Sequence, residues 1–185
     1  MIFNGEMVRA ILDGGKTQTR RPVKVPHIDI DAMCELSGNE LAGELSAGNY
    51  RNSPHGKPGD RIWVRETWAR YNIDQDSHDM AYRATPPADW PEEGRWRPSI
   101  HMPRWASRLM LEITGVRVER LQAITLGDIC KEIGCGLYDF RPATYGFQVW
   151  EELWKSIYGE ENWQANPWVW VIEFKVVPNV QDNPD

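Results

Sequence analysis

Residues 14–21 of the chain read Gly-Gly-Lys-Thr-Gln-Thr-Arg-Arg and follow a short helical pattern over Glu6–Asp13. Two consecutive glycines end a helix readily, because glycine adopts the left-handed backbone that closes the last turn. The lysine, threonines and arginines that come next include no acid. In a regular strand Lys16 and Thr19 would point to opposite faces, so a shared ligand would require the backbone to bend between them. The pattern alone allows two interpretations, a solvated basic turn or a binding loop.

The composition is that of a globular protein with one domain. The chain has 185 residues, of which 41% are hydrophobic and 26% charged, and this length is enough to bury a core. The sequence shows no apolar run long enough to cross a bilayer and no secretory leader. Its three cysteines, Cys34, Cys130 and Cys135, form no Cys-x-x-Cys pair. An odd number of thiols is typical of a reducing compartment, so we expect a cytoplasmic protein without membrane contact.

The charge is distributed unevenly along the chain. The formal net charge is −6, yet residues 16–24 and residues 95–108 each hold four Lys or Arg residues and no acid. An acidic protein does not coat nucleic acid through bulk charge. Local basic patches on an acidic body instead favour a defined anionic ligand.

The hydrophobic pattern predicts a mixture of helices and strands. Strands are expected over 61–68, in two short runs of 109–121 that meet at Thr114-Gly115, and over 168–177. A helix should begin at Thr125 and end at Gly134 or Gly136. A second helix over 144–158 should bury one face, which consists of Phe147, Trp150, Leu153, Trp154 and Ile157. Because regular βαβ alternation is missing, we expect an α+β protein with a small mixed or barrel-like sheet flanked by helices.

Two stretches have weak periodicity. Residues 22–58 are predicted to be a long connection that is functional, mobile or contains a short hairpin, and residues 69–94 a surface insertion. Alternating His27, Asp29 and Asp31 could hold a metal, but nothing nearby completes a site. We therefore expect no metal and no cofactor. His55 and His78 are expected to be exposed to solvent.

Residues 95–108 combine four arginines, a histidine and two tryptophans. Arginines bind phosphates, and exposed indoles stack on bases. The segment is therefore a candidate nucleic-acid contact, although the tryptophans could equally be core anchors. Glu66 shares the inward face of the 61–68 strand, where a carboxylate needs a partner. An ion pair with Arg61, Arg65 or Lys16 is expected for Glu66 rather than catalysis.

With these residues in view, the chain resembles the ASCH domain family, which has a PUA-like β-barrel fold. The family signature Gly-x-Lys-x-x-Thr-x-Arg is matched by Gly14, Lys16, Thr19 and Arg21. Further matches are Gly59-Asp60 before a strand, the 121–134 helix entry and the 171–175 strand. The strings 63–68 and 98–105 are similar to those of phage and prophage members. The resemblance implies a single domain over 1–178, with insertions at about 22–58 and 69–94 and a polar tail over 179–185.

The resemblance also implies a cleft for RNA or a modified nucleoside. A small bacterial amidohydrolase of this family deacylates the exocyclic amine of cytidine derivatives, and its lysine, threonine and glutamate correspond to Lys16, Thr19 and Glu132. Metal-free amide hydrolysis would then use Lys16 as base, Thr19 as nucleophile and Glu132 either as acid or as the group that orients the lysine. Glu66 is a rival carboxylate. The expected ligand contacts are Arg20, Arg21, Glu66, Arg97, His101, Arg104 and Trp105.

Two other functions fit the same residues. A non-catalytic RNA-binding module would hold phosphates with Lys16, Arg21 and the 95–108 segment. A ribonuclease that cleaves single-stranded RNA would place Lys16 and the arginines on the transition-state phosphate. The sequence leaves the oligomeric state open.

Overall fold

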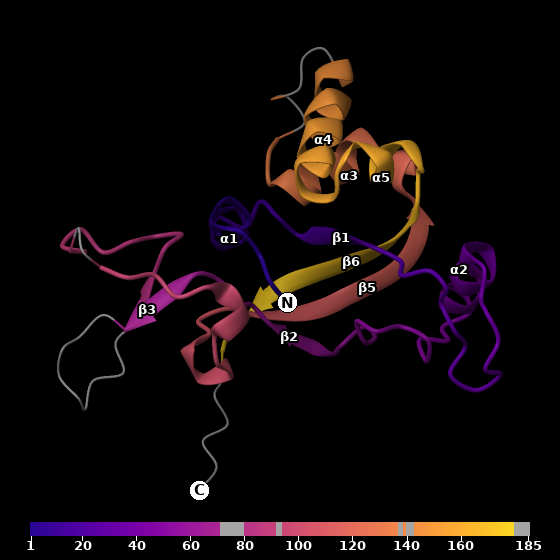
Figure 1. Cartoon of the computed structure of the whole chain (residues 1–185), viewed down its shortest axis with the longest axis horizontal. Helices are drawn as coiled ribbons and strands as arrows, with labels where there is room; N and C mark the ends of the chain where they lie inside the picture. Colours follow the sequence, from indigo (N-terminus) through magenta and orange to yellow (C-terminus); the bar gives the residue numbers. More distant parts are fainter. Residues whose placement is uncertain (71–79, 92–93, 137–138, 140–142, 180–185) are drawn as a thin grey trace, which may run out of the picture.

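The computed structural model describes residues 1–70, 80–91, 94–136, 139 and 143–179 (Figure 1). Its helices are α1 (Gly5–Leu12), α2 (Gly38–Ser46), α3 (Leu126–Ile133), α4 (Ala143–Tyr158) and α5 (Glu160–Gln164). Its strands are β1 (Gln18–Pro22), β2 (Arg61–Trp63), β3 (Trp68–Arg70), β4 (Met80–Tyr82), β5 (Met110–Arg120) and β6 (Trp168–Val177). Short 3-10 turns cover Ser99–His101, Arg104–Ala106 and Leu121–Ala123. The α+β class is confirmed.

Four strands form one antiparallel sheet in the order β1-β6-β5-β2, which curls into a half-barrel (Figure 1). β6 is an internal strand, as its almost continuous apolar sequence predicts. The two runs predicted within 109–121 form the single strand β5, with a bulge between Ile113 and Gly115. An extra residue in a bulge lets a strand bend without ending, which explains why a turn was expected at that place.

Both faces of the sheet are covered, because alternate residues of β6 enter different cores. Val169 and Val171 pack with Trp150 and Trp154 of α4 and with the buried residues of α3. Trp170 and Ile172 face the other side and pack with α2. Within the described residues, no helix is long and apolar enough to cross a membrane.

Residues 22–58 contain α2, which the sequence analysis did not predict. Ser37 accepts a hydrogen bond from the amide of Glu40, and the Glu40 carboxylate accepts one from the amide of Ser37. This capping box stabilises the first turn of a nine-residue helix. Leu41 and Leu45 are its only buried residues, and two positions give too weak a periodicity to reveal a helix by pattern alone.

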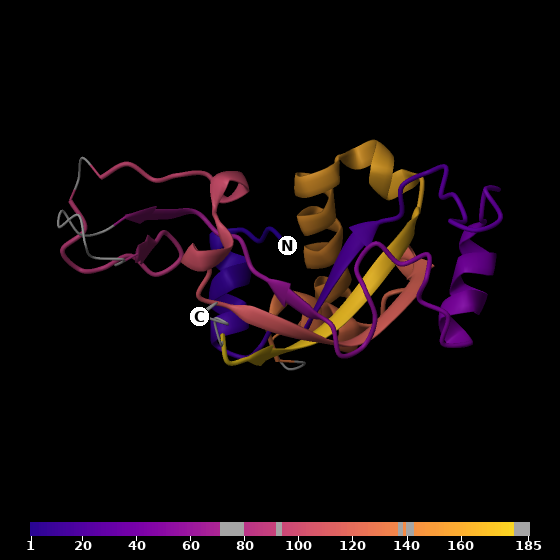
Figure 2. The same cartoon turned by 90° about the horizontal axis from the view of Figure 1, so that it is seen from below.

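The strand expected over 61–68 is broken into β2 and β3. Val64, Glu66 and Trp68 are nevertheless all buried, so the predicted inward face is confirmed. Trp68 begins the separate β3–β4 ribbon, and Figures 1 and 2 show this ribbon projecting from the sheet, away from α2. His78 and parts of the expected surface insertion lie outside the described residues.

The two predicted helices of the second half are present. The Thr125 side chain accepts a hydrogen bond from the amide of Asp128, and α3 ends at Gly134, whose φ is +88°. In α4, Trp150 is buried as expected, but Phe147 and Ile157 are 44% and 45% exposed. The predicted apolar face was therefore too wide, because α4 packs through its tryptophans. Asn179 donates to the Ser107 carbonyl, and residues 180–185 lie outside the described residues.

Candidate functional site

A turn of two glycines brings β1 against the end of α3. Gly14 has a φ of +75°, and a Cβ on Gly15 would lie 2.7 Å from the carbonyl oxygen of Gly134. Only glycine permits so close a backbone approach. The amide of Thr17 donates to the Lys131 carbonyl across this contact. The glycine pair therefore serves the packing of α3 on β1, and the side chains that follow enter a buried polar network.

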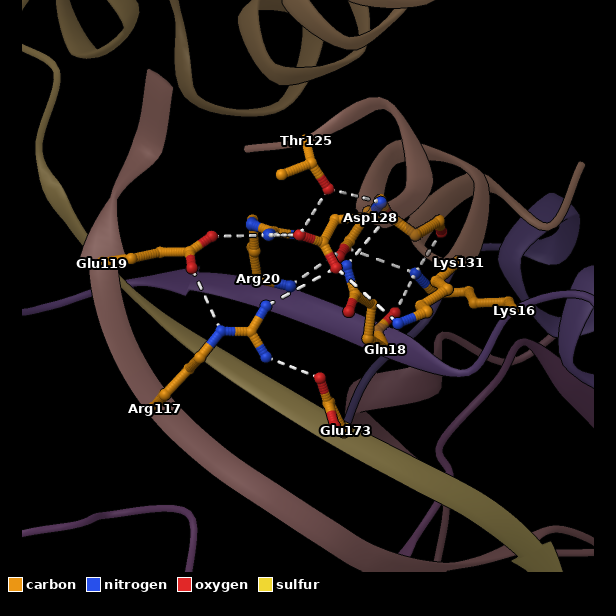
Figure 3. A network of polar contacts seen from close by, with 10 residues as sticks. Lys16, Gln18, Arg20, Arg117, Glu119, Thr125, Asp128, Lys131 and Glu173 are labelled. Atoms are coloured by element: carbon orange, nitrogen blue, oxygen red, sulfur yellow. Dashed lines mark hydrogen bonds and ion pairs between the residues drawn. The ribbon is translucent and has the colours of Figure 1, made fainter. Parts of the chain in front are cut away.

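Lys16 lies in this network rather than in a cleft (Figure 3). Its side chain is fully buried, and Nζ donates to the Gln18 carbonyl (2.8 Å), the Glu132 carbonyl (2.5 Å) and Oε1 of Glu132 (3.3 Å). Burial lowers the pKa of Lys16, the Glu132 carboxylate opposes this effect, and Arg21 and Arg20 add to it. The ammonium has three donors, and these three acceptors occupy them.

Arg20 is the second cation of the network and is also buried. Its guanidinium lies 2.6 Å from Glu119, 3.3 Å from Glu132 and 3.7 Å from Asp128, and Figure 3 shows Glu119 and Asp128 converging on Arg20. The backbone amide of Arg20 also donates to Oε1 of Glu132, at 2.9 Å. Glu132 is thus the partner of two buried cations, and removal of its carboxylate would leave both with an uncompensated buried charge.

Thr19 is buried beside Glu132. The two residues line a small cavity of about 10 Å³ that is closed mainly by α4, which is room for about one water molecule. Lys16 does not line this cavity. Arg20 Nε and Trp150 Nε1 belong to residues that do, and both are buried without a hydrogen-bond partner. The structure therefore places Thr19 and Glu132 at one cavity, whereas Lys16 contacts the Glu132 carboxylate without lining that cavity.

Arg21 connects this cavity with a much larger one. Its guanidinium donates to the Ile2 carbonyl (2.8 Å) and to the Tyr158 hydroxyl (3.4 Å). The larger cavity, which we call the basic pocket, has a volume of about 940 Å³. It is lined by Met1, Ile2, Arg21, Pro22, Lys24, His27, Pro54, His55, Ile62, Arg65 and Trp170. No carboxylate is among these residues.

Three cations of the basic pocket, the side chains of Arg21, Lys24 and Arg65, have no acidic partner among the described residues. Within the part of the chain that the structure describes, no ion pair includes Arg21, Lys24 or Arg65. Residues 1–3 run beside Arg65, whose amide donates to the Met1 carbonyl at 2.7 Å. Met1, Ile2 and Arg65 therefore meet at the wall of the pocket. Unpaired cations around one cavity create a positive potential that attracts anions.

Two histidines complete the wall of the pocket. The rings of His27 and His55 both meet the Trp170 indole edge-on, at 5.7 and 5.6 Å between centroids. Burial, followed by the charges of Arg21 and the N-terminal amine, lowers the pKa of His55 from 6.5 to about 4. His55 was expected to be exposed, and this expectation was wrong, because its ring packs on Trp170 and is only partly accessible.

The rival carboxylate, Glu66, is paired structurally. Both of its oxygens accept from Arg108, at 2.8 and 2.9 Å, and Glu66 is 2% exposed. An ion pair was expected, but with a different partner. A bidentate pair with Arg108 fixes the chain between β2 and β3 to the strand β5 that follows Arg108.

The candidate contacts in 95–108 lie apart from the basic pocket. Arg97, His101, Arg104 and Trp105 are exposed, and none of them lines it. The Arg97 guanidinium lies over the Trp68 ring at 5.2 Å, and the Trp105 ring meets Trp68 edge-on at 5.9 Å. The Arg97 guanidinium and the Trp105 ring thus both pack against Trp68, the first residue of the β3–β4 ribbon. No cluster of three metal-ligating side chains occurs among the described residues.

Sequence reasoning missed Lys24, His27, His55, Arg65 and Trp170 as pocket residues. One signal was present, since the first acid after Asp13 is Asp29. The acid-free run therefore extends through His27 and includes four of the lining residues, Arg21, Pro22, Lys24 and His27. Nothing in the sequence indicated that residues 54–55 and Arg65 would meet this run.

No family model matches the sequence, and neither does any curated protein. Among solved structures, the chain is similar to the crystal structure of protein EF3133 from Enterococcus faecalis V583, a DUF984 protein. The TM-score is 0.43 and the identity 10%, over 97% of this chain and 75% of that chain. A similarity at this level identifies no family for the chain.

Proposed function

We propose that this chain is an ASCH-type protein with a PUA-like fold, and that it binds single-stranded RNA or a phosphorylated nucleoside in the basic pocket. The observation that carries the proposal is the meeting of Arg21, Lys24 and Arg65 around one cavity without an acidic partner among the described residues. Each guanidinium group can donate two parallel hydrogen bonds to phosphate oxygens, and the lysine adds a positive charge. These three side chains therefore suit a phosphorylated ligand.

The dimensions and the remaining lining residues also suit a nucleotide. A volume of about 940 Å³ is at the upper end of the range for small-molecule sites. The rings of His27 and His55 offer aromatic surface on which a base can stack. Ile62 and Pro54 add apolar area. The overall charge of −6 limits binding elsewhere on the surface.

Binding to a fluorescent single-stranded RNA should test this proposal by anisotropy in the presence of EDTA. We expect Lys24→Gln and Arg65→Gln each to weaken binding about tenfold and to lower the salt slope by about 0.7, as for one lost phosphate contact. Lys24 is exposed, so its replacement should leave the fold intact. Lys175→Gln is the control, because this exposed lysine pairs with Glu112 away from the pocket. Unchanged binding by both pocket variants would refute the site.

A second candidate is metal-free hydrolysis of an N4-acylated cytosine, and one observation favours it. Thr19 and Glu132 share the small cavity next to Arg21, and two further residues that line it, Arg20 and Trp150, each hold a buried side-chain donor without a partner among the described residues. Because the cavity holds only about one water molecule, the reaction requires α4 to move and admit the acyl group, after which such donors would stabilise the oxyanion that forms when the Thr19 hydroxyl attacks the carbonyl. Incubation with N4-acetylcytidine should then release acetate, and Thr19→Val should abolish the release. No acetate from the unmodified protein would exclude this candidate.

A further inference from the structure

We propose that His27 and His55 act as an acid–base pair that cleaves RNA held in the basic pocket, with the neighbouring ribose 2′-hydroxyl as nucleophile. The inference rests on the proposed function, since it requires an RNA chain in this pocket. Its basis is a juxtaposition: two imidazoles that each meet the Trp170 indole edge-on, in a cavity whose described lining holds three cations without an ion-pair partner and no carboxylate.

His55 has the properties of the base. The charged side chains of Arg21, Lys24 and Arg65 that line its cavity are all cationic, and burial and two of these charges lower the pKa of the neighbouring N-terminal amine to about 6. The imidazole is therefore neutral at pH 7 and has a free lone pair. No hydrogen bond between described residues occupies its ring nitrogens. A phosphate in the pocket would offset the positive charges and make His55 a stronger base when substrate is bound.

His27 has a fixed orientation that suits the acid. Its Nε2 lies 3.1 Å from the carbonyl oxygen of Asn52, and a carbonyl only accepts, so Nε2 carries a proton in either charge state. The proton that His27 can transfer is thus on Nδ1. Asn52 is itself held rigidly, because its amide donates to the carboxylates of Asp29 and Glu44 at 3.0 and 2.9 Å.

The proposed step balances in atoms and charge. Neutral His55 removes the proton of the 2′-hydroxyl while its oxygen attacks phosphorus. The bond from phosphorus to the 5′-oxygen breaks, and protonated His27 gives its proton to that oxygen. The products are a 2′,3′-cyclic phosphate and a 5′-hydroxyl, and solvent exchange restores the two histidines. Arg21, Lys24 and Arg65 would stabilise the additional negative charge on the phosphoryl oxygens as the transition state forms.

The test uses a single-stranded RNA and its all-deoxy counterpart, both end-labelled, with EDTA present. We expect the protein to cleave the RNA and leave the DNA intact, and mass spectrometry to find 2′,3′-cyclic phosphate ends. His55→Gln and His27→Gln should each lower the cleavage rate at least about 100-fold, with RNA affinity changed less than about fivefold. The acidic limb of kcat/KM against pH should lie below pH 6.5 and be lost in His55→Gln.

Three results would overturn the inference. RNA that is bound but not cleaved would refute the chemistry and leave the proposed binding function standing. Cleavage that survives both histidine substitutions, or that also consumes the DNA, would assign the chemistry to other groups. Absence of both binding and cleavage would remove the proposed function as well. Lys175→Gln, purified in parallel, should cleave like the unmodified protein and so exclude a contaminating nuclease as the source of any difference.

Discussion

Nζ of Lys16 donates to the backbone carbonyl of Glu132 and also lies 3.3 Å from the carboxylate of the same residue. Lys16 is 1% and Glu132 4% exposed. A buried ion pair of this kind is tolerated in the fold only while both partners are present, because removal of one partner leaves an uncompensated charge in the interior. The first consequence of the Lys16–Glu132 contact therefore concerns stability.

Lys16→Met should lower the free energy of unfolding by about 3 kcal/mol, since it takes one of two cations from a buried carboxylate. Urea denaturation would measure the change. Lys131→Met is the matched control on α3, because Lys131 is 55% exposed and lies 3.9 Å from Asp128, and its loss should cost less than about 0.5 kcal/mol. Equal stabilities for the two variants would show that Lys16 is not held as described.

Glu66→Gln should destabilise the protein by about 2–3 kcal/mol, because Gln cannot accept both hydrogen bonds of the Arg108 guanidinium. The double variant Glu66→Gln with Arg108→Met should recover part of the loss in a double-mutant cycle. RNA binding in the basic pocket should persist in both variants, since neither residue lines it. A purely additive cycle would contradict direct pairing.

Acidification should destabilise the protein through His55. The unfolded histidine binds a proton near pH 6.5, whereas the folded one does so only near pH 4. Between these values the unfolded state holds more protons, so stability falls as the pH falls through this window. The difference between the unmodified protein and His55→Gln should amount to about 1–2 kcal/mol after allowance for partial solvent screening. Identical pH profiles of the two melting curves would disprove this assignment.

Two glycines of α2 should respond to alanine in opposite directions. A Cβ on Gly38 would lie 2.2 Å from the Trp168 ring, whereas a Cβ on Gly43 meets nothing within 4 Å. Gly38→Ala should therefore cost about 1–3 kcal/mol by overpacking. Gly43→Ala should add up to about 1 kcal/mol through helix propensity. Chemical denaturation of the two variants would decide, and a shift of the same sign in both would contradict the packing of α2 on Trp168.

The sequence predicted long elements well and short or interrupted ones poorly. Helix caps and apolar residue patterns were enough to predict α3, α4 and β6 from the sequence, because each of these signals lies within the element that it predicts. β5 appeared as two strands because a bulge and a turn share the same glycine signal. α2 was missed because its core contact rests on two leucines, although the Ser37–Glu40 capping box was visible.

The candidate site was harder to predict for a physical reason. The sequence around a basic residue does not show whether that residue will form an ion pair with an acid in the folded protein. Lys16 and Arg20 acquire acidic partners from α3 and β5, whereas Arg65 and Lys24 acquire none among the described residues. That distinction depends on contacts between residues 99 to 116 positions apart in the chain, which a local pattern does not contain.

β1 lies at an open side of the sheet, so its outward amides could pair with a strand from another molecule. The Glu132 carboxylate already accepts from the amide of Arg20, and the Lys131 carbonyl accepts from that of Thr17. α3 thus shields this margin of the sheet against intermolecular strand addition. Substitutions that weaken the packing of α3 on β1 should therefore expose the outward amides of β1. We expect such variants to self-associate through this strand, which α3 covers in the intact molecule.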